Sequence, residues 1–170
     1  LAHLHHASGH DTEALAAYEQ AIRRAPKKHE NHLAIARLHR QSRRWGKSLA
    51  SYEASLHLVS QRDLNQMVLK EMAEVALEAK DAQRAETYFQ TLLATAPKNI
   101  FLWMEKGVML NRFSEHERSL SVWNEVRQMA KGKLKHLVVA WKQIAELQER
   151  LGQLDQAEAT LRQALAQLPR

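Results

Sequence analysis

Histidine is the side chain of this sequence that is best suited to bind a metal ion. His3, His5, His6 and His10 cluster near the start, and His6 and His10 have the i, i+4 spacing of two zinc ligands on one helix. However, Gly9 lies between these two and is expected to end the helix there. No zinc-protease motif accompanies the cluster, and the chain has no cysteine to complete a site. The sequence therefore predicts no metal site and no cofactor.

Three glutamates on one predicted helix could perform acid–base chemistry. Glu71, Glu74 and Glu78 share a helix face, but a surface row of glutamates usually is solvated or pairs with a cation such as Lys70. The sequence contains no glycine-rich phosphate loop and no nucleophile elbow. It also lacks a pair of carboxylates in an evident pocket. We therefore expect no enzyme activity from this chain.

Cations dominate the first third of the chain and could bind an anionic partner. Residues 1–47 hold nine Lys and Arg against four Asp and Glu, and the whole chain has a formal net charge of +6. Clustered cations bind polyanions by releasing counterions, but they also keep a protein soluble. Trp45 is the only aromatic residue there that is suited to stacking on bases, which disfavours nucleic acid relative to an acidic protein surface. The predicted basic patch comprises Arg37, Arg40, Arg43, Arg44 and Lys47.

The composition indicates that helices position these residues. The chain has 170 residues, of which 45% are hydrophobic, with only five glycines and three prolines. No apolar run reaches the ~18 residues of a membrane-spanning helix, so we expect no membrane insertion. The chain begins without methionine, so we expect a fragment of a longer protein. The absence of cysteine leaves both the cytoplasm and the periplasm open as its compartment.

Large apolar residues recur at a nearly constant interval along the chain. Smaller residues accompany each of them four positions before and three positions after, as Ala14 and Ala21 do in the first unit. A fixed period of this length is typical of helical repeats, in which neighbouring helix pairs bury each other's apolar faces. The anchors Tyr18, Tyr52, Phe89, Trp123 and Leu161 are separated by 34, 37, 34 and 38 residues.

Apolar spacing and turn residues predict ten helices in five antiparallel pairs. Asn99 is expected to cap one helix, and Ser114 with Glu117 has the spacing of a capping box. We expect one domain over residues 1–170, with units at about 1–28, 29–62, 66–99, 100–133 and 138–170. The predicted helices are Leu1–Ser8, Thr12–Arg24, Glu30–Ser42, Trp45–Leu58, Leu64–Ala79, Ala82–Thr95, Ile100–Arg112, Glu115–Ala130, Leu134–Leu151 and Leu154–Gln167.

Two segments share a motif that opens a helix with tryptophan and continues with a small residue. They are Trp103-x-x-Lys106-Gly107 and Trp141-x-x-Ile144-Ala145, and Gly152 follows the second at a turn. With these motifs and its period, the chain resembles the tetratricopeptide-repeat family over essentially all of its length. The resemblance implies an all-α, right-handed superhelical solenoid of antiparallel helix pairs with about 4.5 repeats. Departures from the family pattern are Ser48, Ser55, Ser60, Lys106 and Lys131.

In the resembling family, the first helices of successive units line a concave groove. The resemblance therefore implies a non-catalytic scaffold that binds a peptide or protein segment, here in a groove that is basic early and apolar around Phe101, Met104 and Val108. Alternatives are the basic patch, or a docking arm of a larger enzyme or of a secretion or envelope complex. Neither end has a polar cap, so end-to-end self-association is also expected. The predicted groove residues are Arg37, Arg40, Lys70, Glu74, Phe101, Met104, Val108, Asn111, Arg112, Lys142 and Glu146.

Overall fold

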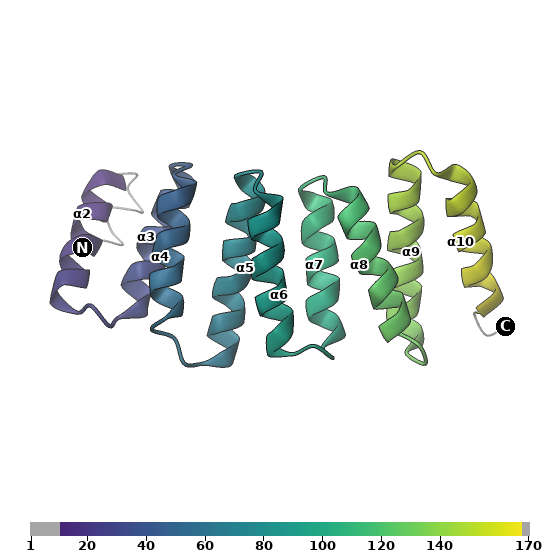
Figure 1. Cartoon of the computed structure of the whole chain (residues 1–170), viewed down its shortest axis with the longest axis horizontal. Helices are drawn as coiled ribbons and strands as arrows, with labels where there is room; N and C mark the ends of the chain where they lie inside the picture. The colour runs from purple at the N-terminus through teal and green to yellow at the C-terminus, as the bar shows by residue number, and fades with distance from the viewer. Residues whose placement is uncertain (1–10, 168–170) are drawn as a thin grey trace. The chain divides into compact units, whose positions relative to one another are not determined.

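The computed structural model describes residues 11–167, which form nine α-helices joined by short turns and contain no strand (Figure 1). These residues confirm the prediction of an all-α chain of antiparallel helix pairs. The predicted helix Leu1–Ser8 and the cluster of four histidines lie outside the described residues. In the part of the chain that is described, no helix is long and apolar enough to cross a membrane. No group of three or more potential metal ligands occurs there either.

The chain divides into two compact units, residues 1–95 and residues 96–170. In the first unit, α3 pairs with α4 and α5 pairs with α6, while α2 packs on α3 and α4 packs on α5. The anchors Tyr18, Tyr52 and Phe89 are all buried, as their period predicts. The helices of this unit are α2 (Asp11–Arg24), α3 (His29–Gln41), α4 (Trp45–Leu56), α5 (Arg62–Glu78) and α6 (Ala82–Thr95).

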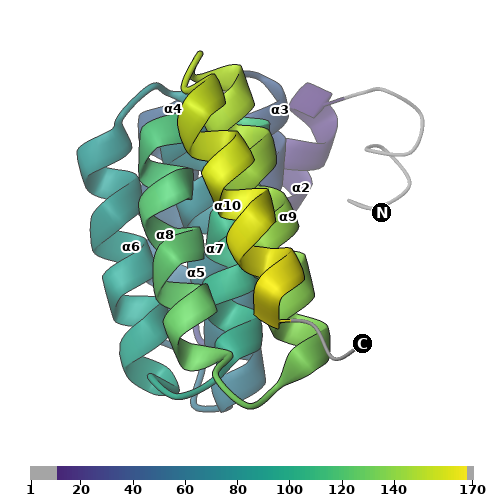
Figure 2. The same ribbon diagram turned by 90° about the vertical axis from the view of Figure 1, so that its right-hand side faces the viewer.

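In the second unit, α7 pairs with α8, α8 packs on α9, and α9 pairs with α10 (Figure 2). Trp123 of α8 and both Trp141 and Ile144 of α9 are buried between these helices. The fifth anchor, Leu161, is 44% exposed, because α10 packs mainly on α9 and no described helix follows it. The helices of this unit are α7 (Ile100–Arg112), α8 (His116–Met129), α9 (Leu134–Arg150) and α10 (Leu154–Gln167).

Each of four helix pairs turns through one residue in the left-handed region of φ. Arg43, Lys80, Ser114 and Gly152 have φ values of 54°, 59°, 63° and 74°. In each turn the next residue donates its N–H to a carbonyl five positions back, for example Glu115 N to Leu110 O at 2.9 Å. This is the Schellman arrangement that ends a helix. The predicted capping box is therefore wrong, because Ser114 closes α7 and makes no side-chain bond to α8. The predicted cap at Asn99 is confirmed, since Asn99 Oδ1 accepts the N–H of Phe101 at 3.1 Å.

Serine replaces the small apolar residue of the family pattern at two equivalent positions, and both serines are fully buried. Ser48 Oγ donates to the carbonyl of Ala36, and Ser119 Oγ donates to the carbonyl of Gly107, each at 2.8 Å. A buried hydroxyl group without a partner would destabilise the fold, so these bonds explain why serine is tolerated there. One of these hydrogen bonds therefore joins α3 to α4, and the equivalent bond joins α7 to α8.

Candidate functional site

In the first unit, the predicted groove arginine Arg37 is held by the helix of the next pair. Arg37 of α3 donates Nε to Glu71 Oε2 at 2.9 Å and Nη2 to Glu71 Oε1 at 2.5 Å. The hydroxyl group of Tyr52 donates to the same Oε2 at 2.6 Å. Two parallel bonds between guanidinium and carboxylate are the strong form of this ion pair. Arg37 therefore joins α3 to α5 rather than pointing freely at a ligand.

The second predicted arginine of α3 makes a similar contact one helical turn later. Arg40 Nη2 donates to Glu74 Oε2 at 2.9 Å and to Glu78 Oε1 at 2.6 Å. Its Nε also lies within hydrogen-bonding distance of both Glu78 oxygens. The structure therefore brings the predicted residues Arg40 and Glu74 together, but as partners of each other. Lys70 lies on α5, as Glu74 does; it is half-buried and also interacts with another residue.

These contacts set the protonation of the network. Burial alone would raise the pKa of Glu71, but the bonds from Arg37 and Tyr52 and the nearby positive charges outweigh it and hold that pKa below its ordinary value. Burial and the bond to Glu71 raise the pKa of Tyr52. The bonds to Glu78 and Glu74 raise the pKa of Arg40. At neutral pH the carboxylate of Glu71 is thus charged and the Tyr52 hydroxyl group neutral.

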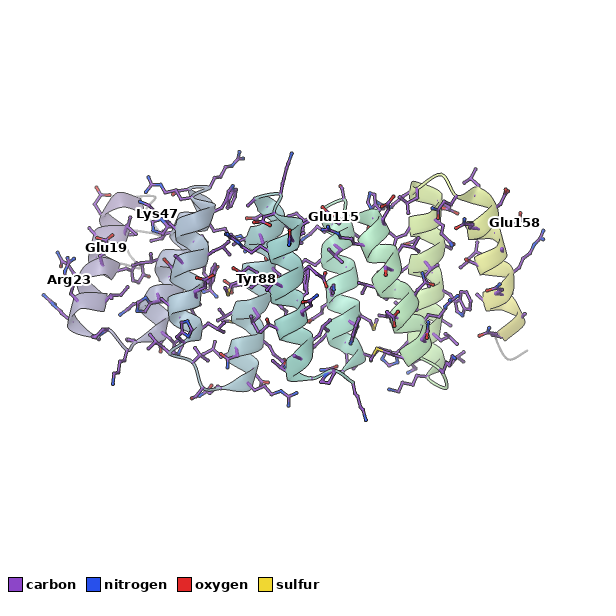
Figure 3. All side chains as sticks on the ribbon, viewed as in Figure 1. Glu19, Arg23, Lys47, Tyr88, Glu115 and Glu158 are labelled. Atoms are coloured by element: carbon purple, nitrogen blue, oxygen red, sulfur yellow. The ribbon has the colours of Figure 1, made fainter. Side chains whose placement is uncertain are left out.

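The predicted basic patch consequently loses two of its five cations to glutamates of α5. Arg43, Arg44 and Lys47 remain exposed on the surface of the first unit. Lys47 is labelled in Figure 3, near the turn between α3 and α4. Elsewhere in this unit, Tyr88 of α6 donates to Glu53 Oε1 of α4 at 3.2 Å, and burial and the nearby Glu53 carboxylate raise the pKa of Tyr88 to about 12. The described contacts therefore give no support to a five-cation site for nucleic acid.

In the second unit, the predicted apolar part of the groove is exposed. Phe101 is 60% exposed and Val108 is 55% exposed on α7, while Val139 is 40% exposed on α9. The Phe101 ring meets the His136 ring edge-on, with ring centroids 5.2 Å apart, so these residues join the two helices on this side. Met104 lies one helical turn after Phe101 on α7, and Val139 lies one turn after His136 on α9. We call Phe101, Met104, Val108, His136 and Val139 the α7–α9 face.

Two other predicted groove residues of α7 are occupied at the turn into α8. Asn111 Oδ1 is hydrogen-bonded to His116 Nδ1 at 3.0 Å. The guanidinium group of Arg112 lies over the Phe113 ring, 5.0 Å from its centroid, and has a further interaction. These side chains therefore stabilise the α7–α8 turn.

The predicted residues Lys142 and Glu146 border an apolar cavity. Their charged groups are 3.6 Å apart, and Gln143 Nε2 also donates to Glu146 at 2.7 Å. The cavity has a volume of about 480 Å³, and Leu161 and Leu165 of α10 are among its walls. Sequence reasoning missed this cavity, although Leu161 and Leu165 lie one turn apart on α10.

A second cavity, of about 410 Å³, lies between α8, α9 and α10 and was also missed. Arg127 and Lys131 supply two cations to its wall, and Leu137 and Trp141 supply apolar surface. The guanidinium group of Arg127 lies over the Trp141 ring, 4.6 Å from its centroid. The remaining wall residues are the amides Gln128, Gln163 and Gln167. We call this space the Arg127 cavity.

Comparisons with known proteins agree with the geometry. Models of the Tetratricopeptide repeat family match residues 1–63 and 33–100, and another matches residues 140–170. No curated protein matches the sequence. Among solved structures, MamA is 15% identical with a TM-score of 0.64, covering 98% of this chain and 93% of that one.

Two further solved structures have the same fold. A tetratricopeptide repeat protein from Parabacteroides merdae ATCC 43184 is 16% identical with a TM-score of 0.61, covering 100% of this chain and 64% of that one. YrrB, described as a TPR protein with an unusual peptide-binding site, is 14% identical with a TM-score of 0.59, covering 97% of this chain and 81% of that one. At these identities the likeness shows the fold, an all-α helical-repeat solenoid.

Proposed function

Because this chain belongs to the tetratricopeptide-repeat family, we propose that it is a non-catalytic scaffold that binds a segment of another protein on its α7–α9 face. Proteins of this family are in general interaction scaffolds, and protein partners are what the fold supports. The observation that carries this proposal is the exposure of Phe101, at 60%, on α7, where its ring meets that of His136 on α9.

Burial of apolar surface supplies the binding energy on this face. A large aromatic side chain that leaves water on binding is the usual centre of an interface, and Phe101 has more than half of its surface to bury. Exposed apolar side chains at helical spacing suit a partner segment with one apolar anchor, either extended or helical. Support for a peptide as the ligand also comes from YrrB, whose description names a peptide-binding site.

The ion-paired network of the first unit supports a structural role for Arg37 and Arg40. Both guanidinium groups already have carboxylate partners, so a ligand would have to replace a strong bond to reach them. We therefore assign partner binding to the second unit. No contact of residues 11–167 favours the alternative of nucleic-acid binding, and end-to-end self-association stays a prediction.

The test begins with a displayed random-peptide library that is selected on the 170-residue chain. Selected peptides are synthesised, and their affinity is measured by fluorescence anisotropy for the original chain and for Phe101→Ala. We expect the substitution to weaken binding by at least tenfold, about 1.4 kcal/mol, because the anchor contact is lost. Met104→Ala should weaken it less, since Met104 is half-buried.

Leu154→Ala is the matched control, because Leu154 is 66% exposed and lies on α10, outside the α7–α9 face. It should leave the affinity unchanged. Equal affinity of the original chain and Phe101→Ala for every selected peptide would remove the α7–α9 face as the binding site.

A further inference from the structure

Arg127 differs from the arginines of the first unit in what surrounds it. Arg37 and Arg40 are held by glutamates of the following helix pair, whereas Arg127 lies against the Trp141 ring. No described residue forms an ion pair with Arg127 or Lys131. Among residues 11–167, no Asp or Glu lines the Arg127 cavity. The described wall of the cavity therefore carries two cations and no carboxylate.

The contact with Trp141 orients Arg127 without using its hydrogen bonds. A guanidinium group stacks on an aromatic ring through its flat face, so the N–H groups at its edge stay available in the plane. These N–H groups match the two oxygens of a carboxylate, and the contact fixes their direction before any ligand arrives. Lys131, in the turn that follows α8, adds a second cation to the wall of the cavity.

The other walls of the cavity are suited to the side chain and the peptide groups that adjoin a carboxylate in a peptide. Leu137 and Trp141 give apolar surface on which an aliphatic side chain can pack. Side-chain amides donate and accept hydrogen bonds, as peptide groups require, and Gln128, Gln163 and Gln167 line the cavity. The volume of about 410 Å³ lies within the range of small-ligand sites and far exceeds the space of a bare ion.

We propose that the Arg127 cavity binds the carboxylate of a peptide, with the carboxylate on Arg127 and Lys131 and the adjoining apolar side chain on Leu137 and Trp141. This site lies on α8, α9 and α10, outside the α7–α9 face, and does not depend on the function proposed above. A simpler account is that both cations stabilise the carbonyl end of α8. That account explains their charge, but it does not explain the absence of acidic residues and the presence of three amides around them.

The experiment uses the 170-residue chain labelled with ¹⁵N and follows the indole N–H signal of Trp141, a group that is buried and has no hydrogen-bond partner. The probes are N-acetyl-Gly-Leu with a free carboxylate, the same dipeptide as its C-terminal amide, and an N-acetylated, C-amidated Asp-Leu dipeptide. We expect saturable shifts with the free acid and none with the Gly-Leu amide. The Asp-Leu probe identifies the source of the bound carboxylate. If this probe binds, the cavity also accepts acidic side chains; if it does not bind, the cavity accepts only the carboxylate of a chain end.

Variants then locate the binding site. Arg127→Gln should weaken binding of the free acid at least tenfold, and Lys131→Gln, at an exposed position beyond the end of α8, should weaken it severalfold with the fold unchanged. Arg118→Gln is the matched control on α8, because Arg118 is 3.4 Å from Glu115 and does not line the cavity. Equal binding of the Gly-Leu acid and amide, or full affinity in Lys131→Gln, would overturn the proposal.

Discussion

Gly107 illustrates how closely single residues are fitted to their neighbours in this fold. A Cβ atom at Gly107 would lie 2.6 Å from Nε1 of Trp123, a side chain that is fully buried. Gly107 precedes Trp123 by 16 residues, as Ala73 precedes the anchor Phe89. The larger anchor, tryptophan, is thus matched with glycine, and the smaller anchor, phenylalanine, with alanine. The glycine therefore makes room for tryptophan.

We expect Gly107→Ala to lower the free energy of unfolding by up to about 2 kcal/mol. Overpacking a rigid, buried ring costs about 1–3 kcal/mol, which exceeds the roughly 1 kcal/mol that alanine gains over glycine within a helix. Urea unfolding would measure the change. Gly46→Ala is the control, since nothing lies within 4 Å of the added atom, and it should not destabilise the chain. A Gly107→Ala chain as stable as the Gly46→Ala chain would show that the ring adapts.

Glu71 links stability to pH. Because its pKa in the folded chain lies below the ordinary value of 4.5, the unfolded chain binds a proton first as the pH falls. The stabilisation by charged Glu71 is therefore complete above that ordinary value and is lost as the pH falls through the lower pKa of the folded state. Glu71→Gln should cost about 1–2 kcal/mol at pH 7, since it weakens the bonds to Arg37 and Tyr52.

The measurement for Glu71 is the free energy of unfolding of both chains between pH 7 and pH 3. We expect the difference between them to shrink as the pH falls below about 4.5. A difference that stays constant over this range would mean that the charge of Glu71 is not what stabilises the contact between α3 and α5. Glu158→Gln serves as the control, because Glu158 pairs only with Arg162 on the exposed surface of α10 (Figure 3).

At the scale of the helix pair, the turns carry residue types that are poorly suited to their backbone conformation. Three of the four left-handed positions carry a side chain, at Arg43, Lys80 and Ser114, although only glycine adopts this conformation without steric cost. Gly152→Ala should therefore lower the free energy of unfolding by about 1 kcal/mol. Ser114→Gly should raise it by up to about 0.5 kcal/mol, because the relief of strain exceeds the entropy that glycine adds to the unfolded chain.

Thermal and urea unfolding of these two variants would check the prediction. The two substitutions act at equivalent turns, so each serves as the reference for the other. If Gly152→Ala were the more stable chain of the two, the left-handed turn would not be a requirement of the helix pair.

The sequence was sufficient to predict the described helix pairs, with every boundary within two residues of its place in the structure. Helices Ala82–Thr95, Ile100–Arg112 and Leu154–Gln167 begin and end where apolar spacing and turn residues placed them. Ser114 was misread because serine followed by glutamate three residues later also fits a helix start. In a turn of three residues, the end of one helix and the start of the next compete for the same positions, and only the backbone conformation decides between them.

At the scale of the whole molecule, the period of the anchors indicated the fold but not the pairing of charges. Arg37 and Glu71 are 34 residues apart, as are Arg40 and Glu74, whereas the anchors of these two units are 37 residues apart. Each glutamate therefore lies three residues, about one helical turn, before the position equivalent to that of its arginine. That spacing is a signal that could have revealed the ion pairs.

The two cavities could not be predicted in the same way. Their walls combine three helices in one case and two in the other, and their volumes depend on how side chains of unequal size pack. Phe101 is 60% exposed, and its place in a partner-binding groove stays a prediction from the resembling family. Its role in binding a partner is the part of the account that still requires an experiment.

The most direct test of that role is an amide hydrogen-exchange map of the 170-residue chain with and without a library-selected peptide. We predict that the peptide slows exchange in α7 around Phe101 and Met104 and in α9 around Val139, while α3 and α5 stay unchanged. Slowed exchange confined to α3, α4 and α5, with none in α7 and α9, would contradict the central claim that the chain binds its partner on the α7–α9 face.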